Sequence, residues 1–545
     1  MAVEKLITDH IDIWSSALQT RSTAGRGSNG KIDLYGIKKL RELILELAVR
    51  GKLVPQDPND EPASELLKRI AAEKAELVKQ GKIKKQKPLP EISEDDKPFE
   101  LPGGWEWTTL KNICVLENGD RSKNYPNKST LVEFGVPFVN AGHLVNGEID
   151  RSEMTFIKEE HFNSLRSGKF HHGDILFCLR GSLGKSALVE NLSGAIASSL
   201  VIIRVFPLVD GEYVNLYFNT PLSYRYIKRY DNGTAQPNLA ATDLERFLVP
   251  IPSFFEQKRI IAKINELMSL CDQLEQQSLT SLGAHQQLVE TLLATLTDSQ
   301  NAEELTANWA RISQYFDTLF TTEASIDALQ QTILQLAVMG LLIESAEFSQ
   351  LDHLKKHLSF GPKNGLSPSE VKYETDIKVL KLGATSYGYL KLQETKYVDI
   401  DVSDKLHLFL KKNDILIQRG NSSNFVGCSL LIEEDFDNLI YPDLMMKIKT
   451  KDELLPEYAT LWLSSPFARN YMWSKMTGTS GTMPKISKKV VEDVPIAVPP
   501  LAVQHQLVIK IKELFLLCGS LKSRLQSAQQ NQLHLADALT DAVLN

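Results

Sequence analysis

The 545-residue sequence contains few cysteines, and their spacing pairs none of them. Its five cysteines, Cys114, Cys178, Cys271, Cys428 and Cys518, are scattered and form no Cys-x-x-Cys motif. This pattern argues against a disulfide framework and against a zinc site. The eleven histidines are dispersed as well. We therefore expect no metal site in this chain.

Long hydrophobic runs are also missing. The most apolar stretch, residues 195–209, is interrupted by Arg204. No window reaches the roughly 20 apolar residues that a membrane helix needs. The first residues do not show a basic segment followed by an apolar one, so no signal peptide is expected. These features predict a cytoplasmic protein that does not enter a membrane.

Enzyme motifs are incomplete. GRGSNG at residues 25–30 fits the pattern G-x-G-x-x-G, but it follows a polar stretch instead of a strand, which favours a linker. GSLGKS at residues 181–186 ends like a phosphate-binding loop, but its first glycine lies two residues too close to the lysine. The Asn/Asp-Pro-Pro-aromatic string with which adenine methyltransferases hold a flipped base does not occur. We predict no catalytic residues and no cofactor in this chain.

Positive charge is in overall deficit but locally concentrated. With 61 Lys and Arg against 68 Asp and Glu, the formal net charge is -7. Between Ser465 and Val491, however, five basic residues and no acidic ones occur: Arg469, Lys475, Lys485, Lys488 and Lys489. Binding to nucleic acid depends on a local basic face and not on the sum. This segment therefore predicts contact with phosphates.

Three pairs of segments repeat within the chain. Residues 249–274 match 496–521 at a constant offset of 247, residues 40–54 echo 329–343, and GDILFCLRG at 173–181 echoes NDILIQRG at 413–420. The middle of the chain holds both repeated helices, whereas one partner lies at the C-terminus and the other at the N-terminus. The two halves are thus circularly permuted. This order predicts an approximate two-fold axis, which suits duplex DNA.

The repeated helices are long. From Glu256 to about Thr297 apolar residues recur at spacings of three and four, which predicts a helix of roughly 60 Å. Its stripe comprises Ile260, Ile264, Leu267, Cys271 and Leu274 and continues through Leu288; the C-terminal stripe comprises Leu507, Ile511, Leu514, Cys518 and Leu521 and continues through Leu535. Such narrow stripes predict an antiparallel coiled-coil seam in which the two stripes meet. Two independent amphipathic helices, each covering a domain, remain an alternative.

The segments between these helices have a mixed α/β pattern. Short β-rich runs are separated by Gly, Asn and Pro turn signals, and a helix follows at residues 213–230 and at residues 456–476. The fold class is therefore predicted as mixed α/β, with two α+β domains separated by the long helices. Five parts follow: a helical region and linker (1–100), a first α+β domain (101–252), a central helical region (253–345), a second α+β domain (346–499) and a C-terminal helix (500–545).

Over nearly its whole length the chain resembles the specificity subunits of type I restriction-modification systems. The resemblance is strongest in LAVRGKLVPQ (47–56), PGGWEWTTL (102–110), DILFCLRGSLGKSAL (174–188) and the runs 232–260 and 493–508. It implies that the α+β domains are target-recognition domains and that each reads one half of a split DNA sequence. The second domain lacks a PGGWEW-like opening, so its start lies around residues 350–363. Its TGTSGTMPKI only partly copies NGTAQPNL, so unrelated half-sites are expected.

The resemblance also implies partners. These are double-stranded DNA, two modification subunits that methylate adenine with S-adenosylmethionine, and two restriction subunits that use ATP and Mg²⁺ for translocation and cleavage. The cofactors belong to those partners, and the helical rod sets an unread spacer of several base pairs. Two alternatives remain: a self-sufficient methyltransferase or nuclease, and a coiled-coil scaffold that binds only proteins.

Base reading needs side chains that present fixed donors and acceptors in the major groove, supported by cations on phosphates. In the first domain the candidates are Arg121, Lys123, Asn124, Tyr125, Asn140, His143, Arg180, Ser182, Lys185, Arg229, Asn232, Gln236 and Asn238. In the second domain they are Ser386, Tyr387, Tyr389, Arg419, Asn421, Ser422, Asn424, Lys475, Thr479, Ser480, Thr482, Lys485 and Lys488. A solvated turn is the alternative for each. Arg180 and Arg419 have the stronger claim, because both follow an Asp-Ile-Leu strand.

Overall fold

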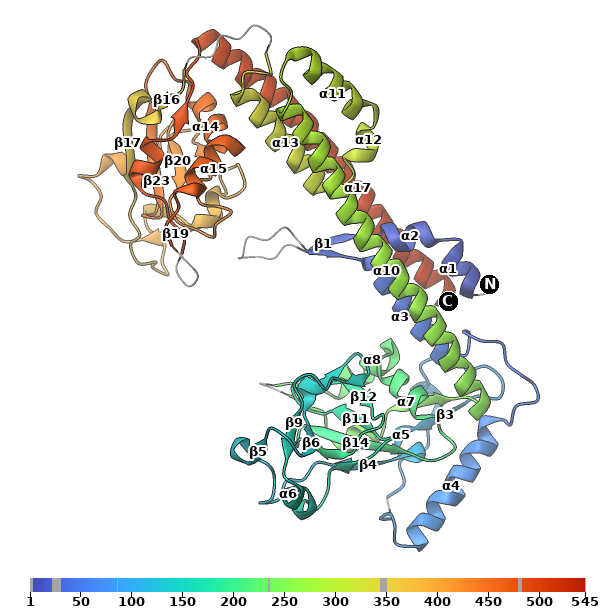
Figure 1. Cartoon of the computed structure of the whole chain (residues 1–545). Coiled ribbons are helices and arrows are strands. Elements are labelled where there is room, and N and C mark those ends of the chain that lie inside the picture. Colours follow the sequence, from blue (N-terminus) through green and yellow to red (C-terminus); the bar gives the residue numbers. More distant parts are fainter. Residues whose placement is uncertain are drawn as a thin grey trace. The chain divides into compact units, whose positions relative to one another are not determined.

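The computed structural model of the chain describes residues 3–21, 31–85, 87–233, 236–343, 350–478 and 483–544. The chain divides into two compact units. Unit 1 comprises Met1–Leu18, Leu34–Gln277 and Gln532–Asn545, and unit 2 comprises Gln19–Asp33 and Ser278–Asn531. Each unit contains one α/β domain and several helices (Figure 1). The predicted mixed α/β fold with long helices is confirmed.

The α/β domain of unit 1 is built on two sheets. The first has the strand order β12-β11-β14-β4, with β4 at Cys114–Asn118, β11 at Ile175–Cys178, β12 at Ser186–Leu188 and β14 at Leu200–Val205. The second has the order β10-β13-β6-β9-β5, with β5 at Leu131–Val132, β6 at Val136–Val139, β9 at Thr155–Ile157, β10 at Lys169–Phe170 and β13 at Gly194–Ile196. All four residues of β11 are buried, as the unbroken apolar run of that strand predicts.

Smaller elements complete unit 1. A hairpin joins β7 (Leu144–Val145) to β8 (Glu148–Ile149), and β3 (Glu106–Thr109) pairs with β15 (Leu248–Ile251). The helices are α1 (Val3–Thr8), α2 (Ile11–Ser16), α3 (Tyr35–Val49), α4 (Ala63–Lys79), α5 (Leu110–Ile113), α6 (Glu159–Ser164), α7 (Gly211–Phe218), α8 (Pro221–Tyr230) and α9 (Ala241–Leu244).

Unit 2 repeats this plan with fewer strands. Its sheets have the orders β17-β23-β20-β21 and β19-β18-β22, and β16 pairs with β24. The strands are β16 (Asp352–His353), β17 (Leu358–Asn364), β18 (Ile377–Leu380), β19 (Thr395–Val398), β20 (Ile415–Gln418), β21 (Ser429–Leu431), β22 (Leu439–Ile440), β23 (Met445–Thr450) and β24 (Pro495–Ile496). The helices are α11 (Ala302–Gln314), α12 (Phe316–Leu319), α13 (Glu323–Val338), α14 (Pro456–Ser464), α15 (Pro466–Ser474) and α16 (Lys488–Glu492), and a ribbon of β1 (Gln19–Arg21) and β2 (Lys31–Asp33) also belongs here.

Each predicted domain-closing helix is in fact two helices. The prediction of single helices over 213–230 and 456–476 is wrong, because Pro221 and Pro466 lack an N–H and each begins a new helix. The side chain of Thr220 accepts a hydrogen bond from the backbone N–H of Ser223, and that of Ser465 accepts one from Ala468. Capping by a hydroxyl residue directly before proline therefore starts α8 and α15.

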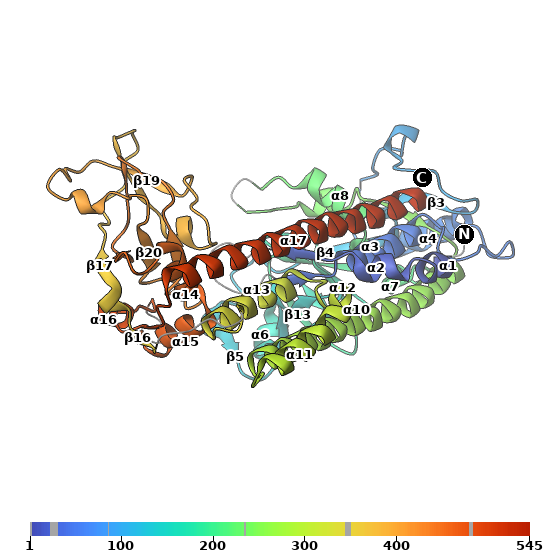
Figure 2. The ribbon, with the colours of Figure 1, turned by 90° about the horizontal axis from the view of Figure 1, so that it is seen from above.

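The two long helices are α10 (Phe254–Thr297) and α17 (Leu501–Leu544) (Figure 2). Each contributes residues to both units. The repeat at an offset of 247 begins both helices with the same hydrogen bonds. The Gln257 amide oxygen accepts from the Asp210 N–H at 2.8 Å, and the Gln504 amide oxygen accepts from the Leu455 N–H at 2.9 Å. The amide nitrogens of both glutamines donate to the proline carbonyl five residues earlier. Similar sequence thus produces the same local structure twice.

The predicted seam residues are buried within their own units. Ile260, Ile264, Leu267, Cys271 and Leu274 are at most 7% exposed, and α3 packs beside them, because Arg41 Nη2 reaches Asp272 Oδ1 at 2.7 Å. In unit 2, Leu507, Ile511 and Cys518 are buried and Leu514 and Leu521 half-buried, in a core cluster that includes α13 and Val289, Leu293 and Leu296 of α10. Ile260 to Leu274 and Leu507 to Leu521 thus belong to different units, and the meeting of these two parts of the stripes stays a prediction.

The continuation of the stripes was predicted correctly at Leu296, which is 1% exposed, but wrongly at two other positions. Leu288 is 51% exposed and Leu535 is 47% exposed, whereas Val289 and Ala536 are buried. A helix of 3.6 residues per turn drifts against a strict alternation of three and four, so the buried position moves by one residue along a long helix.

Candidate nucleic-acid interface

In the first domain, the loop after β11 lies against the loop before α9. An isolated β-bridge joins Arg180 to Asn238, and Arg180 Nε donates to Asn238 Oδ1 at 3.1 Å. The N–H of Gly181 donates to the Pro237 carbonyl at 3.0 Å. The structure thereby brings together candidates that are 58 residues apart. Because Nε is engaged, the guanidinium plane is oriented and its terminal amino groups can serve an anion or a base edge.

The loop before α9 is held by its own polar groups. Asn238 Nδ2 donates to Asn232 Oδ1 at 2.7 Å. The Asp231 carboxylate accepts from the backbone N–H groups of Asn238 at 2.9 Å and Gly233 at 3.0 Å, which lowers the pKa of Asp231. Gln236 in this loop is exposed. The loop therefore presents Asn232 and Gln236 from a braced turn.

The second domain joins the corresponding loops in the same way. Isolated bridges pair Lys485 with Gly420 and with Thr477, and the N–H of Ile486 donates to the Arg419 carbonyl at 2.9 Å. Lys485 replaces Asn238 in the comparison of Pro-Lys-Ile with Pro-Asn-Leu. Within the described residues, Arg419 Nε is buried without a hydrogen-bond partner. In this register Arg419 corresponds to Leu179, whose carbonyl accepts from the Leu239 N–H at 2.9 Å, and Gly420 corresponds to Arg180. The second domain thus places the exposed cation of Lys485 where the first domain has Asn238, and this suits a phosphate.

Other candidates of the first domain divide into exposed residues and structural ones. The exposed ones are Arg121, Lys123, Ser182, Lys185 and Arg229. Asn124 Nδ2 donates to the Ser164 carbonyl, and the Tyr125 hydroxyl accepts from the Ser198 N–H. Both side chains therefore help to hold the loop that carries them.

Asn140 and His143 close a tight turn. Asn140 Oδ1 accepts from the Gly142 N–H at 2.8 Å, and His143 Nδ1 accepts from the Asn140 N–H at 3.1 Å. The imidazole is 6% exposed, and its Nε2 lies 3.1 Å from the Glu153 carbonyl. Both ring nitrogens are engaged, so we remove His143 from the set of base-reading candidates.

In the second domain, Tyr387 and Tyr389 are 60% and 58% exposed. Lys391 Nζ lies 4.0 Å from the ring centroid of Tyr387 and 5.3 Å from that of Tyr389. Lys391 was not among the residues predicted from the sequence, because its approach to both rings depends on the turn at residues 386–389. Exposed aromatic rings beside a cation are groups on which nucleic-acid bases can stack.

The loop after β20 uses several polar groups internally. Asn421 Nδ2 donates to Gln418 Oε1 at 2.6 Å, and Asn421 Oδ1 accepts from the Ser422 N–H. Arg469 Nη2 donates to the Asn424 carbonyl at 2.7 Å, so α15 pins this loop. Lys475 and Lys488 are exposed near the loop ends, and Thr479, Ser480 and Thr482 lie outside the described residues, as does the GRGSNG segment.

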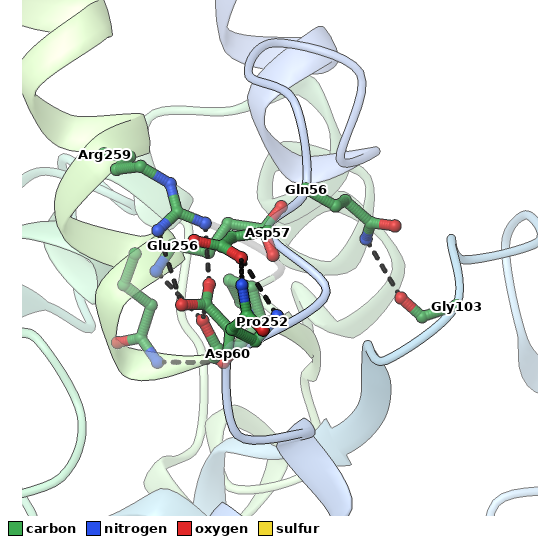
Figure 3. Close-up of polar contacts among 10 residues, drawn as sticks. Gln56, Asp57, Asp60, Gly103, Pro252, Glu256 and Arg259 are labelled. Carbon is green, nitrogen blue, oxygen red and sulfur yellow. Dashed lines mark hydrogen bonds and ion pairs between the residues drawn. The ribbon is translucent and has the colours of Figure 1, made fainter.

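A polar cluster fastens the segment after α3 to the start of α10 (Figure 3). Asp60 Oδ2 accepts from Arg259 Nη2 at 2.6 Å and from Ser253 Oγ at 2.7 Å. The bond from Arg259 is the main reason why the pKa of Asp60 is lowered. In the same view Gln56 Nε2 donates to the Gly103 carbonyl at 3.0 Å. The cluster therefore joins the N-terminal helical region, the domain opening and α10 within unit 1.

Among the described residues, no group of three or more His, Cys, Asp and Glu side chains is arranged to hold a metal ion. None of the helices in the described part of the chain combines the length and the apolar composition that crossing a lipid bilayer demands.

Comparisons with known proteins agree with the internal repeat. The family model described as type I restriction modification DNA specificity domain matches twice, at residues 102–283 and 362–528. The EcoEI and EcoAI type I restriction enzyme specificity subunits of Escherichia coli are 46% and 43% identical to this chain, each over 100% of both chains. A solved structure described as the structural basis of complex assembly and conformational transition of the type I R-M system is 17% identical, covers 82% of this chain and 99% of its own, and has a TM-score of 0.49.

Matches of this identity and coverage confirm the resemblance found in the sequence. The chain belongs to the family of type I restriction enzyme specificity subunits.

Proposed function

We propose that the chain is the non-catalytic, DNA-reading subunit of a type I restriction-modification complex, and that each α/β domain reads one half of a split target. One observation carries the proposal. In both domains the loop after the central strand is bridged to the loop before the last short helix, and the bridge holds Arg180 in one domain and Arg419 with Lys485 in the other. Paired polar loops that carry cations are suited to a DNA groove.

The chemical difference between the two bridges supports two different half-sites. The guanidinium of Arg180, oriented by Asn238, has the geometry for a bidentate contact with guanine or for a phosphate. Lys485 brings an exposed cation to the place that Asn238 has in the first domain, which favours a phosphate. Base reading in the second domain then falls to neighbouring side chains such as Tyr387 and Tyr389.

The helical regions have a proposed role as scaffold and as ruler. The relatives are named as specificity subunits of type I restriction enzymes. Two modification subunits with S-adenosylmethionine, and two restriction subunits with ATP and Mg²⁺, are the proposed partners on the helices. The 44 residues each of α10 and α17 correspond to about 66 Å per helix. Repeated helix starts support a pseudo-two-fold, circularly permuted arrangement that suits duplex DNA.

The test is sequencing of methylated DNA from cells that express this chain with its modification subunit. We expect one split motif with a fixed spacer for the natural chain. Arg180→Ala should relax one half and Lys485→Ala should weaken recognition at the other half. Lys68→Ala, an exposed change on α4, serves as the control and should alter neither. A contiguous motif, or both variants acting on the same half, would contradict the proposal.

A further inference from the structure

Gln418 joins two loops of the second domain that are distant in sequence. It lies at the end of β20 and is 1% exposed. Its Nε2 donates to Thr385 Oγ1 and to Ser386 Oγ, both at 3.0 Å, and its Oε1 accepts from Asn421 Nδ2 at 2.6 Å. One buried amide thus connects the 382–391 loop to the 419–428 loop. Its donors and its acceptor are both satisfied, as a buried amide requires.

A second connection lies nearer the surface. The rings of Tyr387 and Phe425 meet edge to face with centroids 5.8 Å apart, and these residues belong to different loops. On the exposed side, Lys391 Nζ lies within 5.3 Å of the ring centroids of both Tyr387 and Tyr389. We call the hydrogen bonds of Gln418 the polar joint and the ring contact between Tyr387 and Phe425 the aromatic joint. Together they hold the two loops as one rigid piece.

The first domain lacks the polar joint. Cys178 occupies the position of Gln418, because each lies four residues after the aspartate that precedes the strand, Asp174 or Asp414. Cys178 Sγ lies 3.1 Å from the Arg180 carbonyl, which is in its own loop. In the first domain the turn at residues 140–143 corresponds to the 382–385 segment. It is closed by a hydrogen bond from the Asn140 N–H to His143 Nδ1, within the turn itself. The joint is therefore specific to the second domain.

We infer that Gln418 is the positioning residue for reading of the second half-site: it sets the distance between the 382–391 loop, with Tyr387 and Tyr389, and the 419–428 loop, with Ser422. Side chains that read neighbouring base pairs must keep a fixed spacing to discriminate between bases. Gln418 itself does not need to touch DNA, because it is buried below both loops. This inference rests on the proposed function.

The experiment maps methylated sites of the full chain in complex with its modification subunit. Gln418→Glu keeps an acceptor for Asn421 but loses the donors to Ser386 and Thr385, and Gln418→Met loses both sides of the joint. We expect both variants to lower the discrimination at one or more positions of the second half-site by about five-fold or more, with the first half-site unchanged. The matched control is Cys178→Ala at the equivalent position of the first domain, which should leave both half-sites as they are.

A third variant tests the same inference without changing Gln418, for the case in which a Gln418 variant does not fold. Phe425→Leu removes the aromatic joint without touching Gln418, and it should relax the same positions of the second half-site. Hydrogen exchange of β20 and β23 tells a folded variant from an unfolded one, and if Gln418→Met unfolds the domain, Gln418→Glu and Phe425→Leu decide. Discrimination at the second half-site equal to that of the natural chain, in folded variants, overturns the inference. A natural chain without any split motif overturns the proposed function instead.

Discussion

At the scale of single residues, a buried carboxylate organises the central sheet of each domain. Asp174 Oδ2 lies 2.7 Å from Arg204 Nη2, and at the equivalent place Asp414 Oδ1 lies 3.1 Å from Lys449 Nζ. The second domain adds Lys447, whose side chain is 2% exposed and whose Nζ lies 2.8 Å from Asp414 Oδ2. Burial lowers the pKa of Lys447, and the carboxylate opposes that effect. A buried ion pair is costly to break, because the remaining charge is left without a partner.

Replacement of Lys447 by methionine is therefore expected to destabilise the second domain by about 3 kcal/mol. Lys449→Met is the control, because Lys449 is 41% exposed and should cost about 1 kcal/mol or less. Urea unfolding at pH 7 measures both changes. Equal losses for the two variants would show that burial of Lys447 is not the cause.

The contact between Asp60 and Arg259 leads to a second prediction at this scale. Asp60→Asn should reduce stability by about 1–3 kcal/mol at pH 7, because a charge-assisted hydrogen bond is lost. The pKa of Asp60 is lowered in the folded chain from its ordinary value of 3.8. The stabilisation by this hydrogen bond is therefore full above pH 3.8 and disappears as the pH falls through the folded-state pKa. Guanidinium unfolding between pH 7 and pH 2 should show the difference between the two proteins shrinking at the acid end. Gln56→Ala, nearby but uncharged, should give a difference that does not depend on pH.

The loops that hold the candidate residues could be predicted from sequence, but not which side chains in them remain free. Polar residues in turns satisfy backbone groups as readily as they meet a ligand. Asn140 and His143 form their own turn, and Asn421 is engaged by Gln418. These contacts depend on the third dimension, so composition alone did not separate them from Arg180 or Lys485.

At the scale of elements, the long helices were predicted well because nothing interrupts their pattern. The expected start of the first helix at Glu256 is two residues from the observed Phe254, and its end at Thr297 agrees. The helices predicted over 213–230 and 456–476 were not divided at Pro221 and Pro466, because a proline preceded by a hydroxyl residue can begin a helix as well as end one. Strands were found where apolar runs were continuous, as in β11 and β20.

Glycines inside the long helices offer a gain in stability. A Cβ atom added at Gly283 in α10 or at Gly519 in α17 meets no atom within 4 Å. Alanine at either position should stabilise the chain by about 0.5–1 kcal/mol, because glycine loses more backbone entropy in a helix. Thermal unfolding measures the gain. Gly36→Ala in α3 is the contrasting variant, because its Cβ would lie 2.3 Å from the Trp14 carbonyl oxygen and should destabilise. A fall in stability for both Gly283→Ala and Gly519→Ala would indicate a role for flexibility in the helices.

At the scale of the whole molecule, the sequence repeats correctly indicate local structures that the two domains share. The same glutamine contacts begin α10 and α17, and the same loop bridge occurs in both domains. The two domains share their strands and helix starts, whereas their loops differ in sequence. The second domain therefore has no PGGWEW-like opening, but it still forms the β16–β24 pair where the first forms β3–β15. A short strand needs little sequence signal when its partner is already in place.

If the helices act as a ruler between the half-sites, their length should set the spacer. Both α10 and α17 pass from one compact unit to the other, after Gln277 and after Asn531. Insertion of four helix-forming residues at both points adds about 6 Å and slightly more than one turn to each helix. The methylated motif should then keep both half-sites and gain about one to two base pairs of spacer, at roughly 3.4 Å per base pair. Insertion into α10 alone should shift the apolar stripe out of register and abolish methylation. An unchanged spacer with methylation retained in the double insertion would show that something other than helix length measures the DNA.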